Sequence, residues 1–218
     1  MRKIIELCHE IKHGEETYPG LPAPHICDFW SRDDSANKYE DGSTFQIGKI
    51  TMVANTGTYL DAPFHRFEEG ADLAAIEPDS FAALNAYCLS VAGEDNVIGS
   101  EHLAEIPSGT EAVLFFTGWD KHWATDKYAD EHPYLSEDCA RELVAMGVKL
   151  AGIDSINIDN IHHPSRPIHT ILLGSGVLIV EHMTRLDELV GKSFEFHAAP
   201  APVVGMGTFP VRAYAIVD

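Results

Sequence analysis

The residues best suited to chemistry lie close together, between positions 55 and 65. This segment reads Asn55-Thr56-Gly57-Thr58-Tyr59-Leu60-Asp61-Ala62-Pro63-Phe64-His65. It combines a carboxamide, a phenol, a carboxylate and an imidazole. Side chains alternate along an extended strand, so Asn55, Tyr59 and Asp61 are expected on one face. Pro63 then ends the strand, and His65 follows just past its end. The segment therefore predicts polar groups that converge on one pocket.

The elements that must position this segment are mostly strands. The apolar run at 112–117 predicts a buried strand, and Ser136 with Gly147 predicts the two ends of a helix. The other expected elements are strands at 2–12, 45–54, 58–61, 86–92 and 149–153, a short helix and turn at 73–81, a short helix at 184–190, an apolar segment at 171–180, and a final loop and strand at 198–217. Interleaved elements of this kind indicate an α/β fold with a mixed sheet and few, short helices, in a single domain over residues 1–218.

One long segment, residues 25–43, shows no regular pattern. It is mixed in charge and carries two aromatic residues, Phe29 and Trp30. Loops of this length are uncommon and often act as binding segments or lids. We therefore expect Phe29 and Trp30 to cover a substrate.

Composition narrows the classes of function. The formal net charge of −19 disfavours binding to nucleic acid or to anionic membranes. The beginning of the chain has no long apolar segment of a signal peptide, and no apolar run has the length of a membrane span. A cytoplasmic protein is expected. Its four cysteines are scattered, without a Cys-x-x-Cys pair, and are expected to be reduced.

The segment from 55 to 65 resembles the signature of the cyclase family of metal-dependent hydrolases, which includes kynurenine formamidase and isatin hydrolase. The family motif is His-x-Gly-Thr-His-x-Asp-x-Pro-x-His. Five positions match, namely Gly57, Thr58, Asp61, Pro63 and His65. Asn55 and Tyr59 stand where the family has its first two histidines. The segments 152–159 and 169–181 also look like family segments, so the resemblance covers nearly the whole chain.

The resemblance implies a swivelling β/β/α fold, usually assembled as a homodimer or homotetramer. It also implies that Asp61, His169 and Glu181 hold a divalent metal, Zn or Mn, and that His65 is the general acid and base. Because Asn55 and Tyr59 replace family ligands, a single-metal site, a different metal or no metal are all open.

The resemblance implies hydrolysis of a small amide, N-formyl or lactam substrate. A metal would lower the pKa of its bound water, and His65 would carry a proton to the leaving amine. Asn55, Phe29 and Trp30 are the expected substrate contacts. Two alternatives use the same scaffold. One is a metal-free lyase, dehydratase or isomerase with Tyr59 and His65 as its acid–base pair, and the other is a non-catalytic binder of small molecules.

Overall fold

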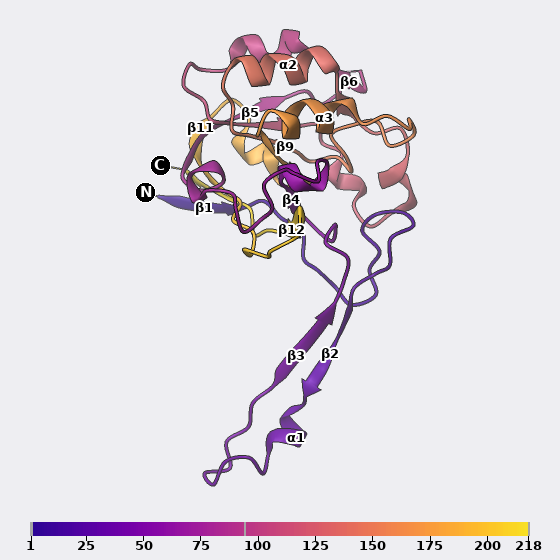
Figure 1. Cartoon of the computed structure of the whole chain (residues 1–218), viewed down its shortest axis with the longest axis vertical. Coiled ribbons are helices and arrows are strands. Elements are labelled where there is room, and N and C mark those ends of the chain that lie inside the picture. The colour runs from indigo at the N-terminus through magenta and orange to yellow at the C-terminus, as the bar shows by residue number, and fades with distance from the viewer. Residues whose placement is uncertain (1, 94, 218) are drawn as a thin grey trace.

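The structure, a computed structural model, describes residues 2–93 and 95–217. Its main feature is one nine-stranded sheet (Figure 1). The strands follow the spatial order β1 (Lys3–Glu6), β13 (Tyr214–Val217), β11 (Ser193–His197), β5 (Leu84–Ser90), β7 (Ala112–Phe116), β9 (Leu150–Ile153), β10 (Leu178–Glu181), β4 (Tyr59–Asp61) and β12 (Thr208–Pro210). The four central strands, from β5 to β10, are parallel, and the flanking pairs are antiparallel. The predicted α/β class with a mixed sheet is confirmed.

Short elements complete the chain. Two small sheets pair β2 (His25–Trp30) with β3 (Ile47–Thr51), and β6 (Val97–Ile98) with β8 (Tyr134–Leu135). The α-helices are α1 (Arg32–Ser35), α2 (Glu137–Ala145) and α3 (Pro167–Gly174). The 3₁₀ helices are η1 (Pro63–His65), η2 (Pro78–Ser80), η3 (Ser100–Glu105), η4 (Asp120–His122), η5 (Asp126–Ala129) and η6 (Leu186–Leu189). Among the described helices, none is long and apolar enough to cross a membrane.

The main sheet has a hydrophobic core on each of its faces. Helices α2 and α3 pack together over one of them, where Leu143 and Leu172 are completely buried (Figure 1). Helix α2 forms as predicted. Ser136 accepts a hydrogen bond from the Cys139 amide at 3.1 Å, and the chain turns at Gly147, where φ is +76°. Apolar burial on both faces explains why the central strands read as continuous apolar runs.

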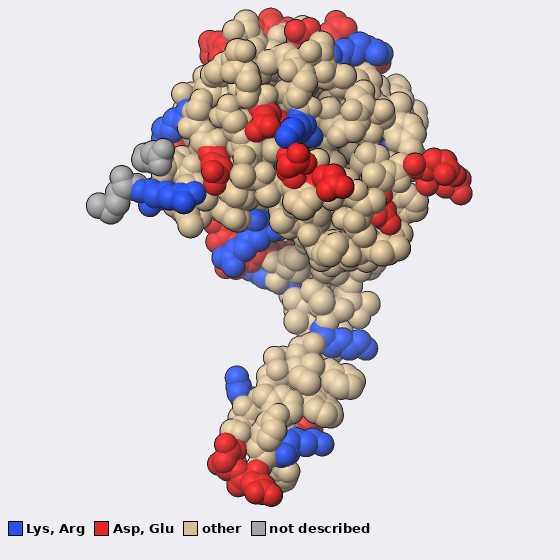
Figure 2. Space-filling model, turned by 60° about the vertical axis from the view of Figure 1, so that its left-hand side comes forward, with Lys and Arg blue, Asp and Glu red and all other residues tan. Residues whose placement is uncertain are grey.

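Residues 25–51, here called the arm, leave the body of the protein as an antiparallel hairpin with α1 near its tip (Figure 1). Figure 2 shows the arm standing clear of the body, with acidic side chains gathered near its end. The prediction of an irregular loop at 25–43 was therefore wrong, because β2 pairs with a partner that lies some twenty positions further along the chain.

Two further expectations needed correction. The apolar segment at 171–180 is not one element, because α3 ends at Gly174 and β10 begins at Leu178. The helix expected at 73–81 is limited to the 3₁₀ turn η2. The short helix expected near 184–190 is present as η6.

Candidate functional site

The site is built where three neighbouring strands, β10, β4 and β12, lie at one end of the main sheet. Residues directly opposite each other in antiparallel strands share a face and come into contact. The register sets Glu181 opposite Tyr59, and Thr208 opposite Asp61. Pairing across the strands therefore fixes two contacts. The Tyr59 hydroxyl donates to Glu181 Oε2 at 2.8 Å, and the Thr208 hydroxyl donates to Asp61 Oδ1.

Asp61 is completely buried, and its two oxygens differ. Oδ1 accepts the hydrogen bond of Thr208, whereas Oδ2 has no hydrogen-bond partner within the described part of the chain. Oδ2 lies 3.6 Å from Nε2 of His169. Burial acts to raise the pKa of Asp61, but hydrogen bonding and charge from His169 and His65 outweigh it and lower that pKa. An ionised carboxylate with one free, buried oxygen is a group that needs a cation.

Helix α3 supplies His169, and Asp159 fixes its ring. Asp159 Oδ2 lies 2.6 Å from His169 Nδ1, and the same carboxylate accepts the backbone N–H groups of Ile168 and His169 at 2.9 Å each. It thus caps the start of α3 and holds the proton on Nδ1. Nε2 is then turned toward Asp61 and Glu181, at 3.6 Å from an oxygen of each. Burial acts to lower the pKa of His169, but the hydrogen bond to Asp159 and the nearby carboxylates of Asp61 and Glu181 raise it to about 10.

Glu181 is also fully buried, but unlike Asp61 it accepts hydrogen bonds at both of its carboxylate oxygens. Oε1 accepts the Ile158 amide at 2.7 Å, and Oε2 accepts Tyr59 and the Asn157 amide group, at 2.8 and 3.2 Å. Burial raises the pKa of Glu181 to about 7, against the opposing effect of His169. Burial likewise raises the pKa of Tyr59 well above its usual value, so its phenol stays protonated and acts as a donor.

His65 lies on η1, directly after the strand that carries Asp61. Its Nδ1 is 2.8 Å from Thr208 Oγ1 and 3.5 Å from Asp61 Oδ1. The Thr208 hydroxyl has one proton, which it gives to Asp61, so it accepts from Nδ1 of His65. The proton of the neutral imidazole is therefore on Nδ1, and Nε2 carries the lone pair. About a third of the His65 side chain is exposed, so that lone pair can reach a substrate.

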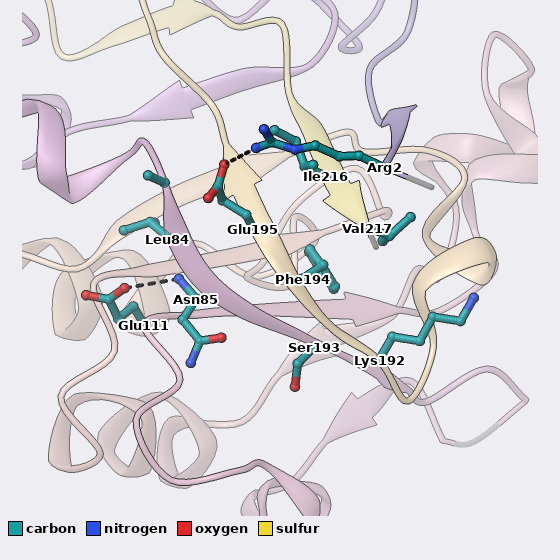
Figure 3. A pocket seen from close by; sticks show the side chains of 11 residues that line it. Arg2, Leu84, Asn85, Glu111, Lys192, Ser193, Phe194, Glu195, Ile216 and Val217 are labelled. Carbon is teal, nitrogen blue, oxygen red and sulfur yellow. Dashed lines mark hydrogen bonds and ion pairs between the residues drawn. The ribbon is translucent and has the colours of Figure 1, made fainter.

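These groups line a cavity of about 250 Å³. Its wall consists of Tyr18, Leu21, Asn55, Tyr59, Asp61, His65, Arg66, Asn157, Arg166, His169 and Glu181. A larger hollow of about 840 Å³ lies at the other end of the sheet (Figure 3). Its charged groups bond to their neighbours, as in the pair of Arg2 with Glu195 at 3.2 Å. None of the predicted site residues lines it, so the smaller cavity is the candidate site.

The structure thus brings together six of the eight predicted site residues, at positions 55, 59, 61, 65, 169 and 181. Phe29 and Trp30 do not line the cavity. They lie on β2, in the arm, where Phe29 is 62% exposed and stacks on Trp30 at 5.9 Å between ring centroids. The structure therefore does not bring them to the cavity of their own chain, because the arm leads the chain away from the body.

Sequence reasoning gave no role to Asp159, Thr208, Arg66 or Arg166. Asp159 belongs to a segment that resembles the family, and Arg66 directly follows the motif, so both had a local signal. Thr208 is distant in sequence, and only strand pairing places it beside Asp61.

The residues fit a metal ion. Asp61, His65 and His169 each offer a ligand atom, and these atoms lie within 4.8 Å of one another. The Asp61 oxygen without a hydrogen-bond partner faces Nε2 of His169, and Nδ1 of the same ring is bonded to the Asp159 carboxylate. Metal-binding histidines typically have a carboxylate on their second ring nitrogen. Asn55 and Tyr59 offer no imidazole, and the Tyr59 hydroxyl is bonded to Glu181 rather than left free. The donor set therefore suits one metal ion.

A buried carboxylate flanked by two histidines, at the end of a mixed sheet, is an arrangement that suits a metal-dependent hydrolase. The chain belongs to the Cyclase family, whose model matches residues 5–160. It is 33% identical to a kynurenine formamidase of Geobacillus thermodenitrificans over 81% of this chain and 82% of that protein. It is 27% identical to a kynurenine formamidase of Bacillus mycoides, over 96% and 95% of the two chains.

The solved structures show the same fold. Isatin hydrolase A from Labrenzia aggregata superposes with a TM-score of 0.83, at 20% identity over 99% of this chain and 94% of that one. A metal-dependent hydrolase with cyclase activity superposes with a TM-score of 0.80, at 24% identity over 99% and 98% of the two chains. The predicted family and the predicted class, a hydrolase of C–N bonds other than peptide bonds, are confirmed.

Proposed function

We propose that this protein uses a single divalent metal ion to hydrolyse a small amide, N-formyl or lactam substrate. One observation carries the proposal. Asp61 Oδ2 is buried without a hydrogen-bond partner among the described residues, 3.6 Å from Nε2 of His169, whose Nδ1 faces Asp159. The names of the relatives, which include formamidases and isatin hydrolases, support an amide-type substrate.

In this proposal Asp61 and His169 hold the metal, with Glu181 completing the set. When bound, such an ion lowers the pKa of water and polarises a carbonyl oxygen. Oxygen and nitrogen donors suit both Zn and Mn. Asn55, on the cavity wall, adds a carboxamide for orienting the substrate.

His65 moves the proton. Because Thr208 holds Nδ1, Nε2 is the atom that takes a proton from water and returns it to the leaving nitrogen. Tyr59 lines the same wall, and its hydroxyl keeps Glu181 in place. The metal-free alternative requires Tyr59 and His65 to act as a pair, and the bond from Tyr59 to Glu181 directs the phenol elsewhere.

Metal content tests the proposal. Protein purified without chelator should hold about one equivalent of Zn or Mn, and Asp61→Ala and His169→Ala should lose it, whereas Arg141→Ala, on the exposed face of α2, should keep it. Wild type should hydrolyse N-formylaniline or a lactam, and His65→Ala should reduce kcat by about 100-fold or more. A protein that stays metal-free after reloading, or turnover that survives chelation, would overturn the proposal and favour the lyase alternative.

We also propose that the protein is a homodimer in which the arm contacts a second copy. A two-stranded hairpin is at best marginally stable alone in water, and this one exposes Ile26, Phe29, Tyr39, Ile47 and Ile50. The second copy also explains how Phe29 and Trp30 can reach a substrate, across the interface rather than in their own chain. Light scattering on the purified protein decides the matter, since a monomer at all concentrations would refute the dimer.

A further inference from the structure

Two arginines lie on the wall of the catalytic cavity, in a protein with a formal net charge of −19. Arg66 is the residue directly after His65, and Arg166 comes directly before α3. Neither forms an ion pair with a carboxylate among residues 2–93 and 95–217. Two positive charges without anionic partners beside a catalytic centre point to an anion that arrives with the substrate.

Arg66 is held by one end only. Its Nε donates to Thr170 Oγ1 at 3.1 Å, and the Thr170 hydroxyl in turn donates to the carbonyl of Arg166 at 2.8 Å. The outer nitrogens of the guanidinium have no acceptor within the described protein. This bond fixes the direction of the side chain and leaves the two outer N–H groups of its fork available, in the geometry that binds a carboxylate through two parallel hydrogen bonds.

Arg166 is half-buried and more rigid. Its guanidinium donates to the carbonyls of Asn160 at 2.9 Å, Ser165 at 3.1 Å and Ile161 at 3.3 Å, and also to that of His163. All four acceptors are neutral, so its charge is fixed beside the cavity but not cancelled. Arg166 therefore positions the loop at 160–166 and, through its carbonyl, Thr170, while its charge adds to that of Arg66.

Neutralisation of the metal-site carboxylates does not account for these arginines. Neither arginine contacts Asp61 or Glu181, which bond instead to His169 and to neutral donors. A divalent cation would balance these two carboxylates, and Asp159 is already engaged by His169 and the start of α3. The charges of Arg66 and Arg166 remain for a group outside the protein.

We infer that the substrate is a small amide that carries a carboxylate, and that Arg66 is the residue that binds this carboxylate. This inference rests on the proposed function and adds its substrate class. The cavity of about 250 Å³ limits the substrate to a small molecule in which the carboxylate lies near the scissile amide. Arg166 is a positioning residue, because it holds the loop and the hydroxyl that orient Arg66.

A matched pair of substrates tests the inference. N-formyl-2-aminobenzoate carries a carboxylate beside its formamide, and N-formylaniline lacks it. Wild type should prefer the first by about 10- to 100-fold in kcat/KM, as expected for one charge-assisted pair of hydrogen bonds. Arg66→Met should reduce that ratio at least tenfold, mainly through KM. Arg66→Lys should restore only part of it, because lysine lacks the fork. Arg141→Met, a change of the same type on the exposed face of α2, should leave the ratio as in wild type.

A binding measurement makes the result independent of turnover. In calorimetric titrations of the protein as purified, 2-aminobenzoate should bind, and Arg66→Met should raise its Kd at least tenfold. If wild type turns over both substrates without preference, or if Arg66→Met changes neither the ratio nor the Kd, the assignment of Arg66 is wrong while hydrolysis stands. If neither substrate is turned over and no metal is found, but Arg66-dependent binding persists, hydrolysis fails and the carboxylate site stands.

Discussion

The body of the protein and its arm differ in how far the side chains of their strands are buried. Every residue of β9 and β10 in the body is buried, whereas every residue of β3 in the arm is exposed. Both regions carry large apolar side chains, but only in the body do these pack into a core. The body therefore holds its geometry within one chain, whereas the proposed dimer would give the arm a surface to pack against.

This difference also locates the chemistry. All cavity residues except Tyr18, Leu21 and Asn55 come from the body's strands β4 and β10, from α3, and from the turns that follow β4 and β9. Asn55, which follows the arm as the chain returns to the body, reaches the wall of the cavity, and residues 25–51 do not. The geometry of the cavity is thus fixed by buried strand pairing, and under the proposed function variants in the two regions should separate activity from assembly.

The largest effect is expected from Asp61→Ala. It removes the carboxylate that carries the free buried oxygen, together with the acceptor of Thr208. Turnover of N-formylaniline should fall by about 100- to 1000-fold, the range found when a group that stabilises the transition state is removed. Asp28→Asn, a change of similar chemistry in the arm, should keep turnover within twofold. Equal losses in the two variants would show that the site extends into the arm.

A second prediction concerns acid stability, which the body should control through buried histidines. His132 accepts the Ile161 amide at Nε2, at 3.3 Å, and its Nδ1 lies 3.0 Å from the Pro133 carbonyl. Burial lowers the pKa of His132 from 6.5 to about 4. Between pH 6.5 and pH 4, His132 is protonated in the unfolded chain but stays mostly neutral in the folded protein. The stabilisation is thus complete above pH 6.5 and is lost as the pH falls toward 4.

The His132→Gln variant isolates this contribution. Glutamine can accept from Ile161 and donate to Pro133, but it cannot be protonated. The free energy of unfolding of wild type should fall between pH 7.5 and 4 by about 3 kcal/mol more than that of the variant. Urea denaturation at both pH values measures the difference. Burial also lowers the pKa values of His9 and His182. The free energy of unfolding of the variant should therefore still fall as the pH is lowered, but less steeply than that of wild type. Identical pH profiles would mean that His132 titrates normally.

The arm gives the third prediction. Ile26 and Ile50 face each other across β2 and β3, and are 38% and 48% exposed. If a second copy covers them, the double change Ile26→Ser and Ile50→Ser should weaken the dimer by about 10- to 100-fold, because it removes two apolar contacts per arm. Sedimentation over a range of concentrations reports the dissociation constant. Val97→Ser, at a body side chain of 47% exposure, should leave the dimer unchanged. A dimer that tolerates the double change is held together elsewhere.

Local sequence signals predicted the elements whose causes are local. The strand that ends before Pro63, the position of His65 just past that end, and the capped helix α2 followed from neighbouring residues. Helix α3 did not, because it is apolar on nearly all sides and sits between a helix and the sheet, where periodicity cannot separate helix from strand. The ring of His169 is fixed by Asp159 across a turn, and Thr208 reaches Asp61 only through strand pairing. The arm escaped prediction because nothing in β2 marks β3 as its partner.

The smallest effect sharpens the comparison between the two regions, because each contains the same capping chemistry. Ser136 caps α2 in the body by accepting from the Cys139 amide, and Ser31 caps α1 in the arm by accepting from the Asp34 amide, both at 3.1 Å. Replacing an N-cap serine by alanine costs about 1 kcal/mol where the helix unfolds with the protein. Ser136→Ala should therefore lower the free energy of unfolding of the body by about that amount.

In the arm the same substitution should have a different consequence. Ser31→Ala affects a four-residue helix with a single fully buried residue, Ser35, so α1 can open without unfolding the body. The free energy of global unfolding of the Ser31→Ala variant should match that of wild type, while backbone hydrogen exchange at α1 becomes faster. If both variants lose about 1 kcal/mol in the free energy of global unfolding, body and arm unfold as one cooperative unit. Under the proposed dimer, contacts between the arm and the second copy would provide that coupling.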